Sequence, residues 1–241
     1  MYNHMKDSSV VLESTHLSSH KRIWYMLQES SGWLIFFSIW LLYIAVSFIQ
    51  QRLVFTEDVI YNTFGEQLAY DRIEQLLETR KKWEWVGYAI IPIFIFFQVF
   101  FTAACLNVGY LLGEQRSQKI GFRRFFSISI KASIVYPLYS VAMLLVCLFF
   151  LNVEHMEDYS YADFFSIAGL LHLSRSEEWW VMPLRAINIF ELFFCLGLAA
   201  GVSRAMNSSF RSALAFVALS YGVGFLLWML FVMFLQLSLS A

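Results

Sequence analysis

Five apolar runs, each about long enough to cross a lipid bilayer, are the feature that most constrains this chain. A membrane-spanning helix needs roughly 20 mostly apolar residues, because the hydrocarbon core is about 30 Å thick and a helix rises about 1.5 Å per residue. Inside the bilayer the backbone must satisfy its own hydrogen bonds. The sequence therefore predicts an all-α integral membrane protein, a bundle of five transmembrane helices. The expected spans cover residues about 33 to 49, 85 to 112, 127 to 152, 179 to 203 and 211 to 238.

The composition agrees with a membrane location and argues against a nucleic-acid binder. Of 241 residues, 59% are hydrophobic and only 15% are charged, whereas about a quarter of the residues are charged in a typical soluble domain. The 17 Lys and Arg residues nearly balance the 18 Asp and Glu residues, so the chain lacks the basic surface that nucleic-acid binding requires. The expected partners are the lipid bilayer and, within it, other membrane proteins or further copies of the chain.

The sequence contains none of the common catalytic or cofactor-binding motifs. It lacks the P-loop, the Gly-rich dinucleotide turn and the HExxH and GxSxG patterns. Cys105, Cys147 and Cys195 lie far apart within apolar runs, and the five histidines are scattered, so neither set has the spacing of metal ligands. We expect a protein that is not an enzyme and that carries no cofactor and no metal.

The chain is expected to form one membrane domain, residues 32–241, after a cytoplasmic N-terminal tail, residues 1–31. The first apolar run follows a short basic stretch, which is also how a signal peptide begins. Its length and its bulky Trp33 and Trp40 favour a retained span over a cleaved one.

The Lys and Arg residues predict the orientation, because they are enriched in the short cytoplasmic connections of membrane proteins. The other side also carries basic residues, but these are diluted by acidic ones across longer loops. The distribution favours a cytoplasmic N-terminus and an external C-terminus. The residues that carry this bias are Lys6, Lys21 and Arg22 in the tail, Arg116, Lys119, Arg123, Arg124 and Lys131 around the second connection, and Arg204 and Arg211 in the fourth.

The connection between the first two spans, about residues 50 to 84, is long and is expected outside the cell. Its part GEQLAYDRIEQLLETRKKW carries apolar residues near helical spacing, including Leu68, Ile73 and Leu76. This pattern predicts an external amphipathic helix between spans one and two. Such a helix either contacts a partner or a lipid surface, or covers the ends of the spans as a solvated helix.

Three polar residues, Arg185, Asn188 and Glu191, interrupt the fourth apolar run in the segment MPLRAINIFELFF. On a continuous helix the spacing i, i+3, i+6 forms a slanting stripe on one side, which is expected to face the bundle interior or a wet cleft. Glu191 is expected near mid-bilayer, where it either lines a polar path or makes a hydrogen bond that fixes the packing of the helices. Its candidate partners are Gln98, Thr102 and Asn107 in span two and Lys131, Tyr136, Tyr139 and Ser140 in span three.

Four small residues predict close contacts between helices. Gly197 and Gly201 are four apart in GLAAG, and Ser220 and Gly224 are four apart in SYGVG. Small residues at this spacing let two helix backbones approach closely. The simplest pairing brings span four against span five.

The second part of the chain, roughly residues 85 to 238, resembles the Yip (Ypt-interacting protein) domain. The resemblance rests on GEQRSQKIGFRR after span two, on SIVYPLYS with Pro137, on INIFELFFCLGLAAGVSRAM and on RSALAFVALSYGVGFLL. It implies a five-span, non-enzymatic protein that organises membranes or partners. Eukaryotic members associate with small GTPases and trafficking factors, whereas bacterial members have no assigned role. The long acidic N-terminal region of the eukaryotic forms is absent here.

These observations favour a Yip-like membrane scaffold or accessory protein, expected in a bacterial inner membrane. The alternative is a small transporter or permease subunit, in which Arg185, Asn188 and Glu191 line a polar path. The two differ in an observable way, because a transporter needs a polar cavity that reaches Glu191 and a scaffold needs only a closed bundle.

Overall fold

A computed structural model describes residues 32–113, 120–161, 164–171, 173 and 181–240. These residues are mostly helical, and the described part of the chain has no β-strand beyond an isolated bridge between Ser166 and Asn188. Five of the described helices or helix pairs are long and apolar enough to cross a membrane, which confirms the predicted multi-pass fold. The N-terminal tail, Arg116 and Lys119 lie outside the described residues.

The first span is helix α3, Gly32–Leu53, and two further helices follow it closely. A short helix, α4, Glu57–Phe64, begins where the Thr56 hydroxyl accepts a hydrogen bond from the Val59 amide. Helix α5, Tyr70–Leu112, then runs for 43 residues. At about 1.5 Å per residue it is roughly 65 Å long, about twice the thickness of the hydrocarbon core.

The length of α5 corrects the prediction of a separate external helix. The amphipathic segment is helical, but it continues without interruption into the second span. Ile73 and Leu77 on its buried side pack against Ile60 of α4, while its other sides are exposed. The single proline of this helix, Pro92, lies well inside the apolar part and does not end it.

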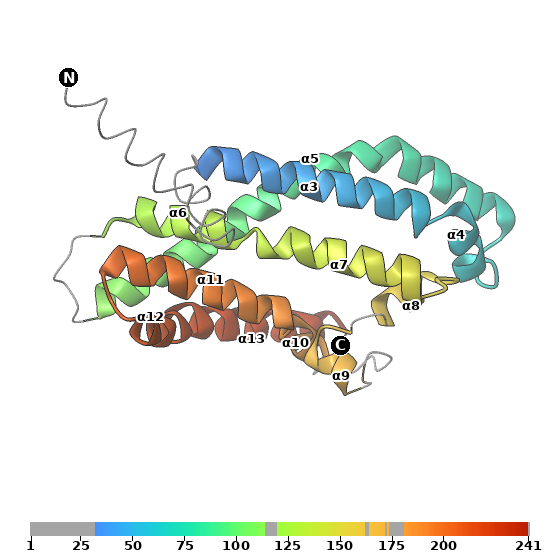
Figure 1. Ribbon diagram of the computed structural model, residues 1–241. Coiled ribbons are helices and arrows are strands. Elements are labelled where there is room, and N and C mark those ends of the chain that lie inside the picture. Colours follow the sequence, from blue (N-terminus) through green and yellow to red (C-terminus); the bar gives the residue numbers. More distant parts are fainter. Residues whose placement is uncertain (1–31, 114–119, 162–163, 172, 174–180, 241) are drawn as a thin grey trace, which may run out of the picture.

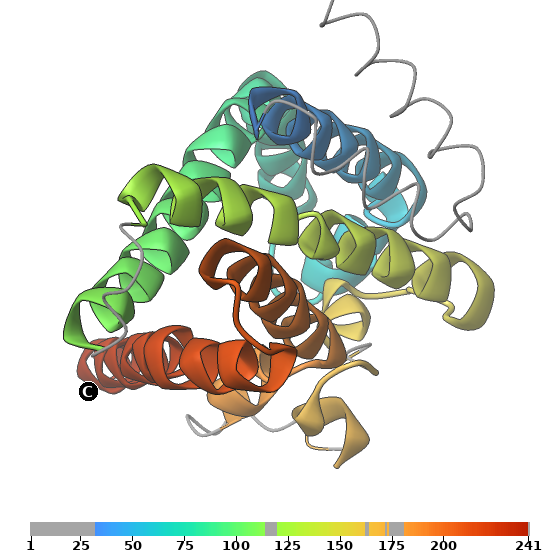
Figure 2. The ribbon, with the colours of Figure 1, turned by 60° about the vertical axis from the view of Figure 1, so that its left-hand side comes forward.

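The third span consists of α6, Phe122–Ala132, and α7, Val135–Phe150, which are joined at Ser133 and Ile134. Figures 1 and 2 show that this pair runs between α3 on one side and α11 on the other. Two short helices follow it, α8, Met156–Tyr161, and α9, Ile167–Leu170.

The last two spans form a tight helical hairpin. Helix α10, Val181–Ala186, precedes α11, Ile189–Met206, and then α12, Phe210–Val217, begins after a short turn. In that turn Asn207 adopts a left-handed conformation with φ 48°, and Ser209 caps α12 by accepting a hydrogen bond from the Ser212 amide. A π-helical turn, η1, Ala218–Gly222, leads into α13, Val223–Ser240.

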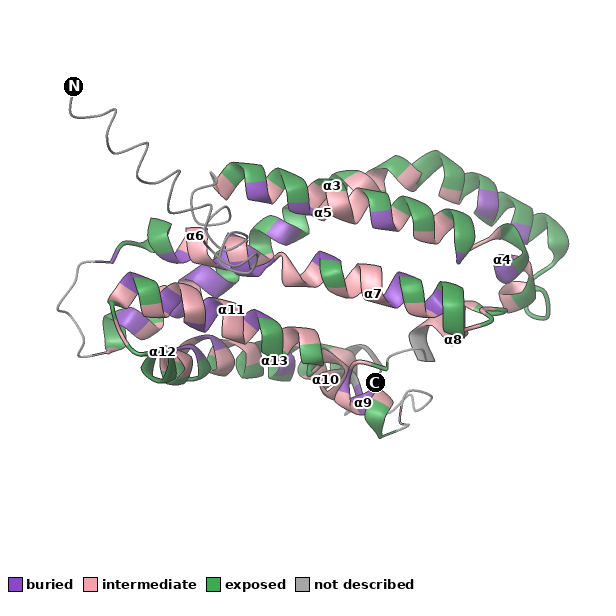
Figure 3. Cartoon of the chain, viewed as in Figure 1, coloured by how far each residue is buried: buried purple, intermediate pink, exposed green. Residues whose placement is uncertain are grey.

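The largest core cluster lies where α5, α6, α11 and α12 meet. Phe125, Phe194, Leu198 and Val217 are fully buried there. Elsewhere, many large apolar residues are exposed, and Figure 3 shows exposed residues along the length of the helices. At most 28% of the residues in the most apolar stretch of any span are buried inside the protein, so most of the remaining surface is suited to lipid.

Candidate functional site

The fourth apolar run is broken in the middle. Helix α10 ends at Ala186 and α11 begins at Ile189, so Ile187 and Asn188 belong to neither helix. The free backbone groups pair with the segment before α9: the Ile167 amide donates to the Ile187 carbonyl at 3.1 Å, and the Ile189 amide donates to the Phe165 carbonyl at 3.0 Å. A break within a membrane requires such partners, because lipid supplies none.

Asn188 stabilises this break by capping α11. Its backbone is extended, with φ −131° and ψ 167°, and its side-chain oxygen accepts a hydrogen bond from the Glu191 amide at 2.9 Å. Asn offers the backbone this alternative to a continuous helix, which explains why the turn forms here. Arg185 lies before the break in the last turn of α10. The predicted stripe along one helix is therefore wrong, because the three residues occupy two helices and the cap between them.

Glu191 joins three spans through its carboxylate. The Tyr136 hydroxyl of α7 donates to Oε2 at 3.0 Å, and the Tyr221 hydroxyl of η1 donates to Oε1 at 2.7 Å. Each carboxylate oxygen thus has one phenolic donor from a different helix. The Gln98 side chain of α5 also interacts with the Tyr136 hydroxyl, so four spans contribute to the cluster.

Aromatic packing surrounds these hydrogen bonds. The Phe194 ring, one turn after Glu191, lies 4.9 Å from the Tyr136 ring and 5.3 Å from the Tyr221 ring, centroid to centroid. Both Phe194 and Tyr221 are buried. Glu191 therefore has two hydroxyl donors, and the Phe194 ring packs against both tyrosines beside it.

The cluster lies deep in the bundle. Tyr136 is 14 residues after Phe122, Tyr221 is 11 residues after Phe210, and Glu191 is 15 residues before the end of α11 at Met206. At about 1.5 Å per residue, all three lie roughly 16 to 23 Å from the same end of the bundle.

The sequence anticipated only part of the Glu191 environment. Tyr136 was among the candidate partners and does contact Glu191. The hydroxyls of Thr102 and Ser140 donate instead to carbonyls of their own helices, those of Gln98 and Tyr136. Tyr221 is the second partner, and the sequence holds a signal for it, because a tyrosine within an apolar run also needs a partner for its hydroxyl.

The small residues make close contacts, but not in the predicted pairing. A Cβ placed on Gly201 would lie 2.5 Å from Ile128 Cγ2 of α6, and one on Gly197 would lie 3.5 Å from Ala132 Cβ of the same helix. Span four therefore uses its glycines against span three. The hairpin contact of α11 with α12 is made by other residues, including Ala205 and Ala213.

Ser220 and Gly224 face span two rather than span four. Ser220 lies directly against Gly109 of α5, where a side chain on the glycine would clash, and Gly224 lies equally close to the Cys105 side chain. Both small residues therefore lie against a neighbouring helix, but that helix belongs to span two and not to the predicted partner, span four.

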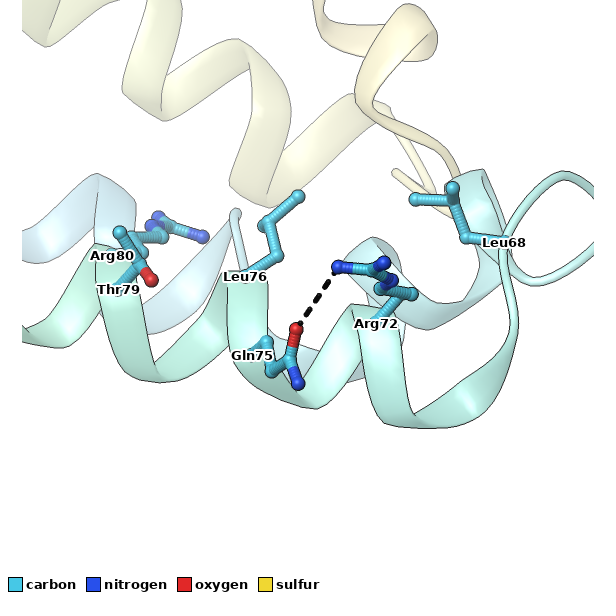
Figure 4. A pocket seen from close by; sticks show the side chains of 6 residues that line it. All are labelled: Leu68, Arg72, Gln75, Leu76, Thr79 and Arg80. Atoms are coloured by element: carbon cyan, nitrogen blue, oxygen red, sulfur yellow. Dashed lines mark hydrogen bonds between the residues drawn. The ribbon is translucent and has the colours of Figure 1, made fainter.

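Two surface pockets of the described residues lie near the start of α5, far from this cluster. One, of about 710 Å³, is an open groove on the outer side of α5 between Leu68 and Arg80; Figure 4 shows Arg72 donating to Gln75 beside it, at 3.4 Å. The other, of about 290 Å³, lies between α3, α4 and α5. Neither is lined by Glu191. Within the described residues, no group of three or more His, Cys, Asp or Glu side chains gathers as metal ligands would.

No protein-family model, no curated protein and no solved structure matches this chain. A carboxyl held by two hydroxyls offers a strong polar contact between spans. The arrangement suits the joining of helices or the exchange of a proton.

Proposed function

We propose that this protein is a non-enzymatic, Yip-like scaffold or accessory protein that organises partners within the membrane. The observation that carries the proposal is the Glu191 carboxylate, whose two oxygens are each engaged by a tyrosine of a neighbouring span. A polar group satisfied on both sides fixes the packing of a closed bundle and requires no substrate. The resemblance to the Yip domain rests on the four motifs quoted above, which follow one another along the chain from the end of span two to span five.

The proposed location is a bacterial inner membrane, with a cytoplasmic N-terminus and an external C-terminus. The support is the basic connection around Arg123 and Arg124, since short loops rich in Arg and Lys stay on the cytoplasmic side. In this orientation the α4 helix and the first turns of α5 extend outside the cell, where they are accessible to partners.

Affinity purification in a mild detergent tests the scaffold proposal. The tagged chain and a tagged, unrelated five-span protein are purified in parallel, and the co-purifying proteins are identified and quantified by mass spectrometry. We expect one or a few membrane proteins, or further copies of the chain, in a fixed ratio to the bait and absent from the control. A bait that emerges as a single chain, at native expression and in several detergents, would argue against a scaffold.

A transporter subunit is the second candidate, and one observation favours it. The apolar run that carries Glu191 is broken, and α11 begins with a capped helix terminus close to the carboxyl. Discontinuous spans with half-helices at mid-membrane are a recurring feature of transporter binding sites. A pH-dependent flux that Glu191→Gln abolishes in proteoliposomes would support this function.

A further inference from the structure

The smaller pocket, of about 290 Å³, lies where the first two spans leave the apolar region. Its wall combines the last turn of α3, the start of α4 and the polar part of α5. Five charged side chains line it: Arg52, Glu57, Arg80, Lys81 and Glu84.

These charges leave an excess of one positive charge in the pocket wall. Lys81 Nζ pairs with Glu57 Oε1 at 2.7 Å, and this contact holds the pKa of the Glu57 carboxyl below its usual value. Glu84 accepts a hydrogen bond from the Tyr88 hydroxyl at 2.9 Å. Neither Arg52 nor Arg80 forms an ion pair with a described carboxylate.

The two arginines are therefore the groups best placed to meet an anion. Arg52 is held on its own helix, because its guanidinium carbon lies 5.4 Å from the centroid of the Phe48 ring. Arg80 is half-buried and lines both this pocket and the open groove along α5. Guanidinium groups suit phosphate oxygens, since they present several donors in one plane.

The position of the pocket along α3 corresponds to the headgroup level of a bilayer. Helix α3 has 22 residues, so its roughly 33 Å length matches the hydrocarbon thickness and places Arg52, one residue before its end, at the boundary. Trp83 and Trp85 of α5 are 57% and 63% exposed beside it, as aromatic residues are at membrane interfaces. Phe48 and Ile49, which precede Arg52 on α3, expose apolar surface on the membrane side of the pocket.

We propose that this pocket binds the phosphate group of an anionic phospholipid between Arg52 and Arg80, with the acyl chains along the exposed end of α3. The single negative charge of such a headgroup matches the excess positive charge of the wall. The volume is enough for a headgroup and too small for a whole lipid, which leaves the chains in the bilayer. A soluble phosphate ester would use the same two arginines, and the experiment separates the two sources.

The test measures lipid retention and thermal stability of the purified protein in detergent. Native mass spectrometry counts bound phosphatidylglycerol and phosphatidylcholine for the wild type, for Arg52→Gln/Arg80→Gln and for Arg72→Gln, a control on the same helix outside the pocket. We expect the wild type to prefer phosphatidylglycerol and to melt at a higher temperature when it is added. The double variant should bind it at least about tenfold more weakly, because each basic residue near a membrane surface contributes about fivefold. Arg72→Gln should bind like the wild type.

Three outcomes would overturn the proposal. The first is that the double variant binds phosphatidylglycerol as tightly as the wild type. The second is that Arg72→Gln loses as much affinity as the double variant, and the third is that the wild type retains phosphatidylcholine as well as phosphatidylglycerol. Glycerol phosphate serves as the soluble arm of the test. If it protects the wild type against heat as strongly as the lipid does, and the double variant loses that protection, the source is a soluble phosphate ester and the membrane part of the proposal fails.

Discussion

Glu191 places a carboxylate against two tyrosine hydroxyls in an apolar part of the bundle. Replacing it distinguishes a role in helix packing from a role in proton transfer. Gln keeps the shape of the side chain and offers an acceptor and a donor, so Glu191→Gln should retain most of the stability. Glu191→Leu leaves the hydroxyls of Tyr136 and Tyr221 without their acceptor and should lower the free energy of unfolding by about 2 kcal/mol. Thermal unfolding in detergent measures both variants.

Function across pH decides between packing and proton transfer. If Glu191 only fixes the packing, Glu191→Gln should behave like the wild type at every pH. Tyr136→Phe and Tyr221→Phe serve as controls, because they keep the carboxyl and remove one hydrogen bond each, about 1 kcal/mol. A stable Glu191→Gln protein with the phenotype of a full deletion would refute the packing interpretation and favour the transporter.

Gly201 is a second residue whose neighbour predicts the result of a mutation. A Cβ at this position would lie 2.5 Å from Ile128 Cγ2, so Ile128 or the helix that carries it must shift to accept any larger side chain. Gly201→Leu should therefore lower the stability by about 1 to 3 kcal/mol. Gly87→Leu is the matched control, because nothing lies within 4 Å of a Cβ there. Equal melting temperatures for the two variants would contradict the close contact.

These residues show what the sequence predicts and what it leaves open. A carboxyl or a glycine within an apolar run indicates that some neighbour is close. Lipid tails offer a carboxyl no hydrogen bonds, and a glycine improves packing only where another helix lies close to it. The identity of that neighbour depends on how the helices are arranged. All apolar helix faces look alike in one sequence, so Tyr221 was missed, and span three was not predicted as the partner of Gly201.

At the scale of elements, the break in the fourth span has a physical reason that apolar length does not reveal. The run from Val181 to Met206 is apolar enough to suggest one helix, but Asn188 competes for the backbone and caps a new one. The unpaired backbone groups are then satisfied by Phe165 and Ile167, which lie 24 and 20 residues before their partners. Such a distant pairing has no local signal.

The second element that differs from expectation is α5, whose continuity can be measured directly. If residues 70–112 form one helix, spin labels at Gln75 and Phe94 are separated by 19 residues and roughly 28 Å along the axis. Both side chains are exposed and tolerate a label. Pulsed electron paramagnetic resonance in lipid nanodiscs should give one narrow distance distribution near that value. A broad or clearly shorter distribution would indicate a hinge between an external helix and the span.

For the whole molecule, the number of spans follows from the sequence more safely than their arrangement does. Each span needs only sufficient apolar length, which the bilayer thickness sets. The end of α5, the start of α6 and the turn between α11 and α12 lie together at one end of the bundle (Figure 1). The connection between α3 and α5 lies at the other end.

One end of the bundle is much richer in short, basic connections. Arg123 and Arg124 begin α6, Arg116 and Lys119 precede them in the same connection, and Arg204 lies near the turn after α11. Basic residues close to the ends of spans resist translocation, whereas acidic residues contribute little. We therefore expect this end to be cytoplasmic.

Reporter fusions test that orientation at four positions. An alkaline phosphatase reporter, active only outside the cytoplasm, should be inactive after Ser117 and after Ser208 and active after Gly65 and at Ala241. A green fluorescent protein reporter, which folds in the cytoplasm, should give the opposite pattern and so controls for expression. Because five spans place consecutive connections on alternate sides, a missing or additional span would invert every position on one side of it. Inversion of all four would show that the molecule sits in the membrane the other way round, with the α4 helix and the start of α5 in the cytoplasm.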